Sequence, residues 1–509
     1  MFAAVGTAAL ATAGLGLHAA PTIAVAPTVS ANLLDTATSS LETGIGTWTA
    51  PNGRLALATR AVHGGHYALS LSAKQAGDYY VESGRLSVVP GQQYTATAFT
   101  STAASSAVVQ AALFFRTASG ASAGAVFGQG TTATTTWSKT REVVALAPAN
   151  AATVSYAVVF YDVKANDARY VDDTIVQTTV RPRSADLVGP FTTAGNKILD
   201  ANGVPVTFRG LARTGFEVYQ WPNNFSEYEV DRAKTWGANI VRVPLGSHYW
   251  LDDSSTADPT YKAKIDAVVK WITDRGMVAL LDLHWHTIGA GSTPGQHFMA
   301  DAAGSIRFWQ ELGARYKSNP LVAFDLYNEP HDISDQVWRD GGTVTEGSFT
   351  YEAAGMQDMV DAVRSTGATN LVFASGNNWS NNFPATAPLT GDNIVYGVHV
   401  YRCPTAAPPN CGGAVNPYDP SPILNGWVTP SKSVPVVITE FGWPDFRDGI
   451  YHENVINYAE AHGWGWVTWG WDGTANQYQF NLLVDVGPGA TYNPSPSGMP
   501  VLKGLALNT

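Results

Sequence analysis

Apolar and polar positions change their pattern near residue 190. From residue 196 onward, short runs rich in Val, Ile, Leu and Phe alternate with longer amphipathic segments. The short runs predict buried parallel strands, and the amphipathic segments predict helices between them. Strands are expected at residues 206–211, 239–244, 277–283, 322–327, 371–374, 394–400, 436–439 and 465–469. Helices are expected at residues 261–274, 305–317, 351–366 and 451–462. This order is typical of an α/β protein with a (β/α)8 TIM barrel.

The segment at residues 31–179 has a different pattern. Short alternating runs are separated there by Gly, Ser, Thr, Ala and Pro, which predicts an all-β sandwich of two sheets. Residues 180–190 contain two prolines, Pro182 and Pro190, and predict a short linker. The expected architecture is therefore multidomain, with a β-sandwich followed by the barrel at residues 191–509.

Composition and charge restrict the class of partner. Only 14% of the 509 residues are charged, and the formal net charge is −11. Nucleic-acid binding requires concentrated Lys and Arg, so this balance argues against it, and a neutral substrate suits the acidic surface. Residues 1–26 are small and apolar like the core of a secretory signal, although a basic start is missing. We expect a secreted, extracellular protein without a membrane anchor, because Gly and Pro interrupt this segment and no other apolar run is long enough.

The two cysteines, Cys403 and Cys411, lie in one loop rich in Pro and Gly. In an oxidising compartment so close a pair predicts a disulfide bond within the loop. Free buried thiols are the alternative, but a loop of this composition does not form a core. A second cysteine pair, which a structural zinc site would need, is not present.

Two glutamates end predicted barrel strands. Glu329 follows an apolar run, and Pro330 cannot continue a central strand, so Glu329 is expected at the C-terminal tip. Glu440 ends the apolar run at residues 436–439 in the same way. Singly, each glutamate has an ordinary explanation as a helix start or an ion-pair partner. Together, two carboxylates at the strand tips of one barrel predict a glycosidase.

Other polar and aromatic residues also follow the predicted strands. Taken singly, each is explained by packing or by an ion pair. A barrel gathers the C-terminal tips of its strands at one mouth, so together they predict one site there. These residues are Arg242, His284, Asn328, Trp379, His399, Tyr401, Trp469 and Trp471.

The strand tips resemble those of the retaining β-glycosidases of glycoside hydrolase family five. The resemblance is carried, in the family's order, by the stretches at residues 240–244, 281–285, 325–330, 397–401, 438–442 and 468–472. It implies that Glu329 is the acid/base and that Glu440 is the nucleophile. A retaining site needs these two carboxyl groups about 5–5.5 Å apart.

The same resemblance implies roles for the surrounding residues. Asn328 would hold the sugar 2-hydroxyl, and His284 and Trp471 would line the −1 sugar position. The implied partners that orient or charge-stabilise the nucleophile are Arg242, His399 and Tyr401. Trp469 and Trp471 are two residues apart, so both are expected on one side of a strand, and which of them stacks on sugar is left open.

A metal site is the competing interpretation of this region. His284, His286 and His297 with Asp282 form the kind of cluster that zinc hydrolases use. The sequence indicates no second shell and no open ligand position. We therefore expect no metal and no cofactor, and a monomer whose partner is an oligosaccharide, polysaccharide or glycoside substrate.

The segment at residues 31–179 resembles the jelly-roll carbohydrate-binding modules of polysaccharide hydrolases. The resemblance lies at residues 32–34, 89–94 and 170–173. Tyr79, Tyr80 and Trp137 are candidate sugar contacts, and Trp48 is expected in the core. Fold resemblance does not establish binding, so a passive spacer is the alternative.

The stretches at residues 298–301 and 338–342 look closest to bacterial cellulases. They favour a β-1,4-glucan substrate and an endoglucanase type of enzyme. Mannanase, xyloglucanase, exo-glucosidase and a diglycosidase that releases a disaccharide from an aglycone share the catalytic set and stay open. A carbohydrate-binding protein whose barrel has lost turnover is the alternative of another class, and the presence of both glutamates disfavours it.

Overall fold

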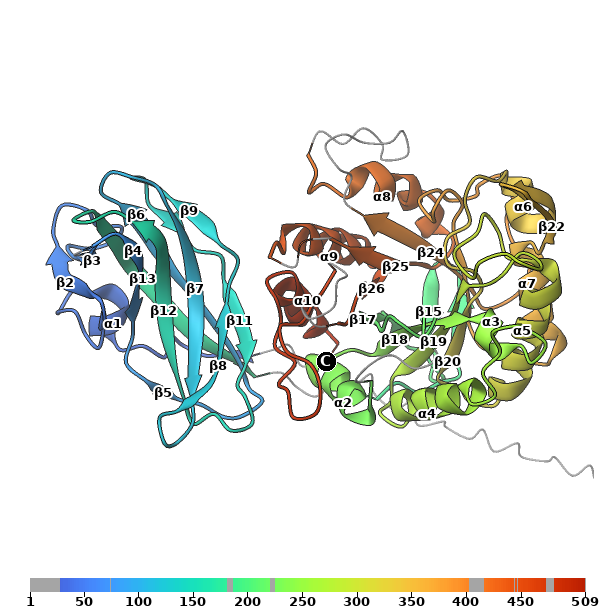
Figure 1. The fold of residues 1–509 in the computed structure, drawn as a ribbon, viewed down its shortest axis with the longest axis horizontal. Coiled ribbons are helices and arrows are strands. Elements are labelled where there is room, and N and C mark those ends of the chain that lie inside the picture. Colours follow the sequence, from blue (N-terminus) through green and yellow to red (C-terminus); the bar gives the residue numbers. More distant parts are fainter. Residues whose placement is uncertain are drawn as a thin grey trace, which may run out of the picture.

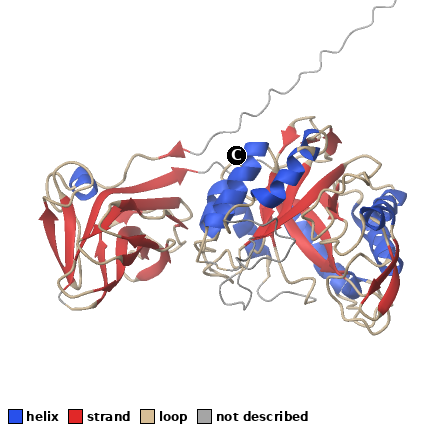
Figure 2. Cartoon of the chain, turned by 90° about the horizontal axis from the view of Figure 1, so that it is seen from above, coloured by secondary structure: helices blue, strands red, loops and turns tan. Residues whose placement is uncertain are grey.

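The computed structural model describes residues 28–508, apart from residues 74, 181–185, 220–224, 402–415, 444, 446 and 473–479. Figures 1 and 2 show an N-terminal part built almost entirely of strands and a C-terminal part with helices around strands. The signal-like segment and the pair Cys403 and Cys411 lie outside the described residues, so secretion and the disulfide stay predictions. Within the described ranges, no helix is both long enough and apolar enough to cross a membrane.

The N-terminal part consists of two antiparallel sheets. Sheet A has the strand order β10-β6-β13-β3-β2, with β1 beside β13 and β11 beside β6. Sheet B has the order β4-β12-β7-β8, with β5 beside β12 and β9 beside β7. The strands of sheet A are β1 (Thr28–Val29), β2 (Gly53–Ala58), β3 (Ala68–Ala73), β6 (Gln93–Thr102), β10 (Ser138–Lys139), β11 (Val143–Leu146) and β13 (Ala168–Val180). Those of sheet B are β4 (Gly77–Glu82), β5 (Leu86–Ser87), β7 (Ala107–Arg116), β8 (Ser122–Phe127), β9 (Thr131–Ala133) and β12 (Thr153–Val163).

Alternate side chains of the two sheets pack between them. Tyr94 of β6 meets Phe115 of β7 edge-on, with 6.4 Å between ring centroids. Trp48 is 3% exposed and packs against Tyr156 at 6.2 Å, so it is a core residue as predicted. Tyr79 is also buried, because strand side chains alternate and Tyr79 points to the face opposite to that of its neighbour. It is therefore withdrawn as a candidate sugar contact.

The C-terminal part is a closed barrel of parallel strands in the order β17-β18-β19-β20-β23-β24-β25-β26. The eight predicted strands are confirmed. A small antiparallel sheet precedes them, in which β15 (Lys197–Leu199) pairs with β14 (Thr192–Ala194) and with β16 (Pro205–Val206). The barrel strands are β17 (Arg209–Ala212), β18 (Ile240–Gly246), β19 (Val278–Trp285), β20 (Val322–Asp325), β23 (Val372–Ser375), β24 (Ile394–Tyr401), β25 (Val436–Gly442) and β26 (Gly465–Thr468).

Helices lie between the barrel strands along the chain and around the barrel (Figure 1). Three of the four predicted helices are confirmed, as α4, α5 and α9. The fourth, α7, begins only at Met356, because Phe349–Ala353 forms strand β22 in a hairpin with β21 (Gly342–Glu346). The helices of the whole chain are α1 (Thr36–Ser40), α2 (Glu227–Trp236), α3 (Ser247–Trp250), α4 (Tyr261–Thr273), α5 (Ala302–Tyr316), α6 (Asp335–Asp340), α7 (Met356–Ser365), α8 (Ser421–Val428), α9 (Ile450–His462) and α10 (Gly498–Leu505), with a 3₁₀ turn η2 at Pro430–Lys432.

Inside the barrel the side chains change from apolar to polar along the strands. Ile240, Leu280 and Ala323 belong to an apolar cluster that fills the interior. Two residues further along the same strands, the corresponding positions are Arg242, Asp282 and Asp325. Side chains two apart on a strand share a face, so these polar groups occupy the next layer toward the C-terminal mouth. The layer of charged side chains above the apolar layer therefore forms the base of a polar site at the C-terminal mouth of the barrel.

The two parts of the chain contact each other beside α9 and α10. The Leu146 N–H at the end of β11 donates to Asn493 Oδ1 at 3.0 Å, and both residues are buried. Two ion pairs that are more exposed lie beside this hydrogen bond: Lys503 with Glu142 at 2.6 Å, and Arg141 with Glu453 at 3.3 Å. These polar contacts join the sandwich to the barrel, and buried apolar residues of both parts, such as Val144 and Met499, belong to one hydrophobic cluster.

We predict that Asn493→Ala destabilises the protein by about 1–3 kcal/mol, because the Leu146 N–H would stay buried without an acceptor. The free energy of unfolding from urea titration measures this. Gln129→Ala is the matched control, since Gln129 also bridges to the barrel, through Asp448, but is only half-buried. Equal losses in both variants would contradict the special role of the buried bond.

Candidate active site

One buried arginine holds the mouth of the barrel together. Arg242 on β18 is 0% exposed, and every guanidinium nitrogen has an acceptor. Nε donates to Asp325 Oδ2 at 2.8 Å, Nη1 to Glu440 Oε2 at 2.7 Å and Nη2 to Asn328 Oδ1 at 2.8 Å, and Nη2 also lies 3.0 Å from Asp282 Oδ2. The planar fork of an arginine is the side chain suited to so many directed bonds. These contacts fix the relative positions of three strands and of one candidate catalytic glutamate.

An irregularity in the sheet brings Glu440 into the interior. Val398 of β24 pairs with Ile438 of β25, but the next residue, His399, pairs with Glu440 instead of Thr439. The extra residue is a β-bulge, which shifts the alternation of the strand by one position. Without the bulge, the side chain of Glu440 would point out of the barrel, on the same side as that of Ile438. The bulge therefore turns the carboxylate toward Arg242.

Both oxygens of Glu440 are held by protein donors. Arg242 bonds to Oε2, and the Tyr401 hydroxyl at the end of β24 donates a short hydrogen bond to Oε1. Burial raises the pKa of Tyr401 far above its usual value, so the phenol keeps its proton and remains a donor. Glu440 is only 5% exposed. Its carboxylate is thus fixed in one orientation beside the opening of the barrel.

Glu329 stands in a different environment. It lies in the loop between β20 and α6, directly before Pro330, and its Oε1 lies 2.8 Å from His399 Nδ1. Burial raises the pKa of Glu329 to about 7, although the nearby His284 and Arg242 oppose this shift. The carboxyl group therefore keeps its proton up to nearly neutral pH, as a general acid must.

His399 is a neutral partner of Glu329, whereas the resemblance implied that it orients Glu440. Burial lowers the pKa of His399 to about 3. Its Nε2 is buried and has no hydrogen-bond partner among the described residues. Leaving an acceptor unpaired costs less than leaving an N–H unpaired, so the proton belongs on Nδ1, which donates to Glu329. His399 thereby orients the carboxyl group without adding charge.

A second charged group lies next to this pair. His284 Nδ1 is 2.6 Å from Asp282 Oδ2. Burial alone would lower the pKa of His284, but the carboxylates of Asp282 and Glu217 outweigh it and raise the pKa to about 9. Burial also raises the pKa of Asp325 and of Glu217. The positive charge of Arg242 opposes this shift at Asp325, because it stabilises the ionised carboxylate.

The three tryptophans predicted as site residues lie in different parts of the barrel mouth and its surroundings. Trp469 stacks on His284 with 5.3 Å between ring centroids and 9° between the planes, so it lies beside the site. Trp471 is 2% exposed and packs against Trp236 and Tyr492, away from the mouth. Strand β26 ends at Thr468, so the alternation that would place both on one side does not extend to them. The role of Trp471 at the −1 position is therefore withdrawn.

Trp379 lies at the rim. Its side chain is 37% exposed, and its ring stacks on His331 with 3.5 Å between ring centroids. The backbone N–H of Trp379 donates to the Pro330 carbonyl. These contacts place it beside the loop that carries Glu329. An exposed indole next to the acid is suited to stacking on a sugar unit outside the cleavage point.

The structure adds residues that the strand-tip pattern did not reveal as part of the site. Asp282 and Asp325 interrupt apolar strands, and that interruption is a signal, since a charged group inside a strand must find a partner. Glu217 and Gln296 come from loops and carry no such signal. Gln296 accepts from Asn328 Nδ2 at 3.0 Å and donates to the Glu329 carbonyl at 2.9 Å, so it braces the segment that carries the acid.

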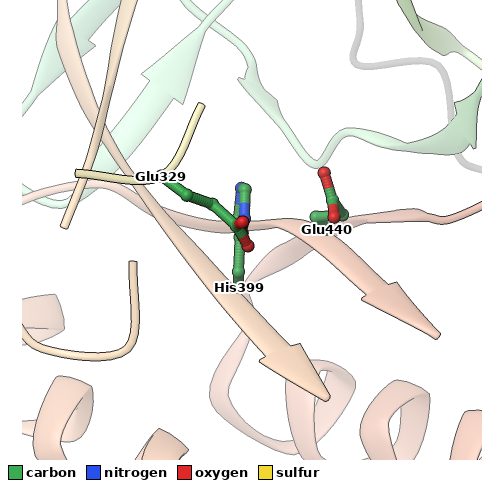
Figure 3. A group of neighbouring side chains, drawn as sticks. All are labelled: Glu329, His399 and Glu440. Atoms are coloured by element: carbon green, nitrogen blue, oxygen red, sulfur yellow. Dashed lines mark hydrogen bonds and ion pairs between the residues drawn. The ribbon is translucent and has the colours of Figure 1, made fainter. Parts of the chain in front are cut away.

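The geometry does not favour a metal ion. His284, His286 and His297 do not form a metal-ligand group, because His284 is bound to Asp282 and His286 Nε2 lies 3.0 Å from the Tyr327 hydroxyl. Among the described residues, the one group with ligand spacing is Glu329, His399 and Glu440, whose ligand atoms lie within 4.8 Å of one another (Figure 3). The guanidinium of Arg242 already neutralises this group from 2.7 Å. The guanidinium beside Glu440 would therefore repel a cation bound to this group.

A parallel eight-stranded barrel with two neighbouring glutamates at its C-terminal mouth, one buried and one partly exposed, is the arrangement of a glycoside hydrolase. The family model described as Cellulase (glycosyl hydrolase family 5) matches residues 199–475. The chain belongs to glycosyl hydrolase family 5.

Known relatives match somewhat more than half of the chain. The chain is 25% identical over 289 residues to endoglucanase MaCel5A of Microbulbifer sp. (strain ALW1), covering 55% of this chain and 51% of that protein. It is 25% identical over 334 residues to an endoglucanase of Paenibacillus polymyxa, covering 57% of this chain and 82% of that protein. It is 22% identical over 303 residues to a mannan endo-1,4-beta-mannosidase of Salipaludibacillus agaradhaerens, covering 57% and 84%. The chain thus spans about half the length of the first of these relatives.

We predict that Arg242→Ala lowers the free energy of unfolding by about 3–5 kcal/mol, since it leaves buried carboxylates without their cation. Chemical denaturation measures this. Arg307→Ala is the matched control, because Arg307 makes a two-bond pair with Asp253 that is largely exposed, and it should change stability little. A small effect of Arg242→Ala would show that the carboxyl groups take up protons at no cost and that the arginine is not the organising group.

Proposed function

We propose that the chain hydrolyses β-1,4-linked glucan with retention of anomeric configuration, with Glu329 as acid/base and Glu440 as nucleophile. One observation carries this proposal: carboxylate oxygens of the two glutamates lie within 4.8 Å of each other. Inverting enzymes need about 6.5–9.5 Å between their carboxyl groups to admit a water molecule, and retaining enzymes about 5–5.5 Å. The short separation therefore favours direct attack by a carboxylate.

In the first step, a Glu440 oxygen attacks the anomeric carbon while the bond to the leaving oxygen breaks. Glu329 gives its proton to that oxygen, so the aglycone leaves as a neutral alcohol. Tyr401 and Arg242 hold the attacking carboxylate in place. The product of this step is a glycosyl ester on Glu440.

In the second step, the ionised Glu329 takes a proton from a water molecule, and the oxygen of that water attacks the anomeric carbon. The ester bond to Glu440 breaks, and both carboxyl groups return to their starting states. The neutral His399 bonds to Glu329 in both states, because a single N–H accommodates a carboxyl or a carboxylate. Asn328, held by Arg242 and Gln296, is assigned to the sugar 2-hydroxyl.

The substrate is assigned from similarity, supported by the site. Two of the relatives are named endoglucanases, and the third is named a mannan endo-1,4-beta-mannosidase. β-1,4-Mannan is therefore the second candidate. Initial rates and product sizes on β-1,4-glucan, β-1,4-mannan, xyloglucan and aryl diglycosides would decide between the substrates and between endo and exo cleavage. No turnover on any of them would favour a non-catalytic carbohydrate-binding protein.

We further propose that the protein is secreted and that residues 31–179 form a jelly-roll carbohydrate-binding domain. The small apolar residues at 1–26 and the two antiparallel sheets support this. The linker is assigned to residues 180–190 and the catalytic domain to residues 191–509. N-terminal sequencing of the protein from culture medium would test the signal, and a start before residue 26 would contradict its removal.

We predict that Glu440→Ala abolishes turnover and leaves the fold intact, because the nucleophile is lost while Arg242 keeps its contacts with Asp325, Asn328 and Asp282. Added azide should restore cleavage of an activated aryl glycoside and yield a glycosyl azide of inverted configuration, which NMR identifies. Residual activity above a few per cent without azide would remove Glu440 from this role.

We predict that kcat/KM for a substrate with a poor leaving group falls as the pH rises through about 7. Burial raises the pKa of Glu329 to about this value. Below this pH the carboxyl group holds the proton that the leaving oxygen needs, and above it the proton is gone. An activated dinitrophenyl glycoside is the matched control, since it needs little protonation. Identical pH profiles for both substrates would contradict Glu329 as the acid.

A further inference from the structure

The outer face of sheet B carries an apolar cluster of its own. Ala112, Ala157 and Val159 are at most 7% exposed, and the half-buried rings of Tyr80, Phe114 and Tyr161 pack against them. This cluster is separate from the core between the sheets. An outer face of a sheet is normally polar, so apolar residues gathered there indicate a contact surface.

The strand register places these residues on one face. Ala157 of β12 pairs with Ala112 of β7, and Ala112 pairs in turn with Phe127 of β8. On the other side of β12, Val159 pairs with Tyr80 of β4. Paired residues in an antiparallel sheet point to the same side. Four neighbouring strands thus present one apolar strip that runs across the sheet.

Aromatic rings form the exposed part of this strip. Tyr80 and Phe114 meet edge-on with 5.7 Å between ring centroids, and Phe114 and Phe127 meet at 5.9 Å. The alanines beneath them are small enough to let the rings lean over the sheet. Phe127, at the end of the row, is 39% exposed. The row therefore offers ring surface to solvent from β4 to β8.

Polar groups border the row and are already ordered. The Tyr161 hydroxyl donates to Gln110 Oε1 at 2.6 Å, and Gln110 Nε2 donates to the Gly128 carbonyl at 3.0 Å. At the opposite border, Glu82 pairs with Arg116 at 3.0 Å, so charge is neutralised there. The strip combines ring faces with neutral hydrogen-bonding groups.

We propose that this strip, made of Tyr80, Phe114, Phe127 and Tyr161, is a binding site for a neutral glycan chain. Pyranose rings present apolar C–H faces and a rim of hydroxyls, which match ring faces bordered by amide and hydroxyl groups. An anionic polymer is disfavoured by a strip without a free cation and by the net charge of −11. That the glycan is a β-1,4-glucan rests on the proposed function of the barrel.

The strip is free to meet a polymer. The sandwich contacts the barrel through Leu146, Arg141 and Glu142, in or beside β11 of sheet A. It also contacts the barrel through Gln129, which follows β8 of sheet B and bonds to Asp448. Phe127, at that end of the strip, is nevertheless 39% exposed. A second copy of the chain is a weaker candidate for the occupant, since a stable interface needs about 800 Å² from each partner. Four rings, three of them half-buried, provide a smaller surface.

A second aromatic group, on sheet A, is a poorer candidate. His63 stacks on Phe99 at 3.6 Å and is held by Asp173 at 2.6 Å, so the chain itself covers that ring. Trp137 is tilted by 49° against Tyr170. Trp137 therefore provides a matched aromatic control in the same domain.

The test uses the full chain with Glu440→Ala, so that bound polymer is not consumed, and measures retention on microcrystalline cellulose and on insoluble β-mannan. Phe127→Ala and Tyr80→Ala should each weaken binding about tenfold, because a lost ring contact is worth about that factor. Phe127 is partly exposed, so its truncation leaves no buried void, and Tyr161→Phe isolates the contribution of the hydroxyl. Trp137→Ala should bind as the parent does.

In chains that keep Glu440, the same substitutions should not change hydrolysis of a small aryl glycoside. Retention on β-mannan alone, lost in both variants, would support the strip and overturn the choice of glucan. Unchanged retention in both variants, equal loss with Trp137→Ala, or no retention of the parent on either polymer would overturn the strip as a glycan site. A change from dimer to monomer in sedimentation, caused by Phe127→Ala, would assign the strip to a contact between copies and overturn it as well.

Discussion

The positive charge of Arg242 inside the barrel is the constraint on which the site depends. Its guanidinium contacts groups on β19, β20 and β25 and in the loop that carries the acid, so those segments cannot shift independently. The charge also makes a cluster of buried carboxylates tolerable in a medium that hydrates them poorly. The site is thereby formed before substrate arrives, and the two glutamates receive different surroundings from one organising group.

Most of the barrel follows from local patterns in the sequence. Apolar runs such as the one ending at Glu440 are buried on both faces, and this makes parallel strands easy to detect. The expected helix at residues 351–366 begins too early, because residues 349–353 pair with residues 342–346 across a two-residue turn that contains Gly347. The pairing is local, and Gly347 at the turn is a sequence signal for a hairpin that the helical interpretation overlooks.

The site was predictable to the extent that strand tips converge. Glu329, His399, Tyr401 and Arg242 come together as expected, because a barrel brings every tip to one mouth. The side chain of Glu440 faces inward only because of the bulge beside His399. No residue in the sequence there predicts this bulge. Trp471 shows the reverse case: its spacing from Trp469 suggested a shared face, but the strand ends before either residue and the spacing loses its meaning.

The buried bond between the Leu146 N–H and Asn493 also limits how this enzyme can be rearranged. If the sandwich is absent, water reaches the Asn493 amide and satisfies it at little cost. If another module is docked in its place without a donor at this point, the oxygen is buried and unpaired. Replacing the sandwich with another domain is therefore expected to cost more stability than removing it. Although a short linker separates the two parts, the N-terminal part is not freely exchangeable.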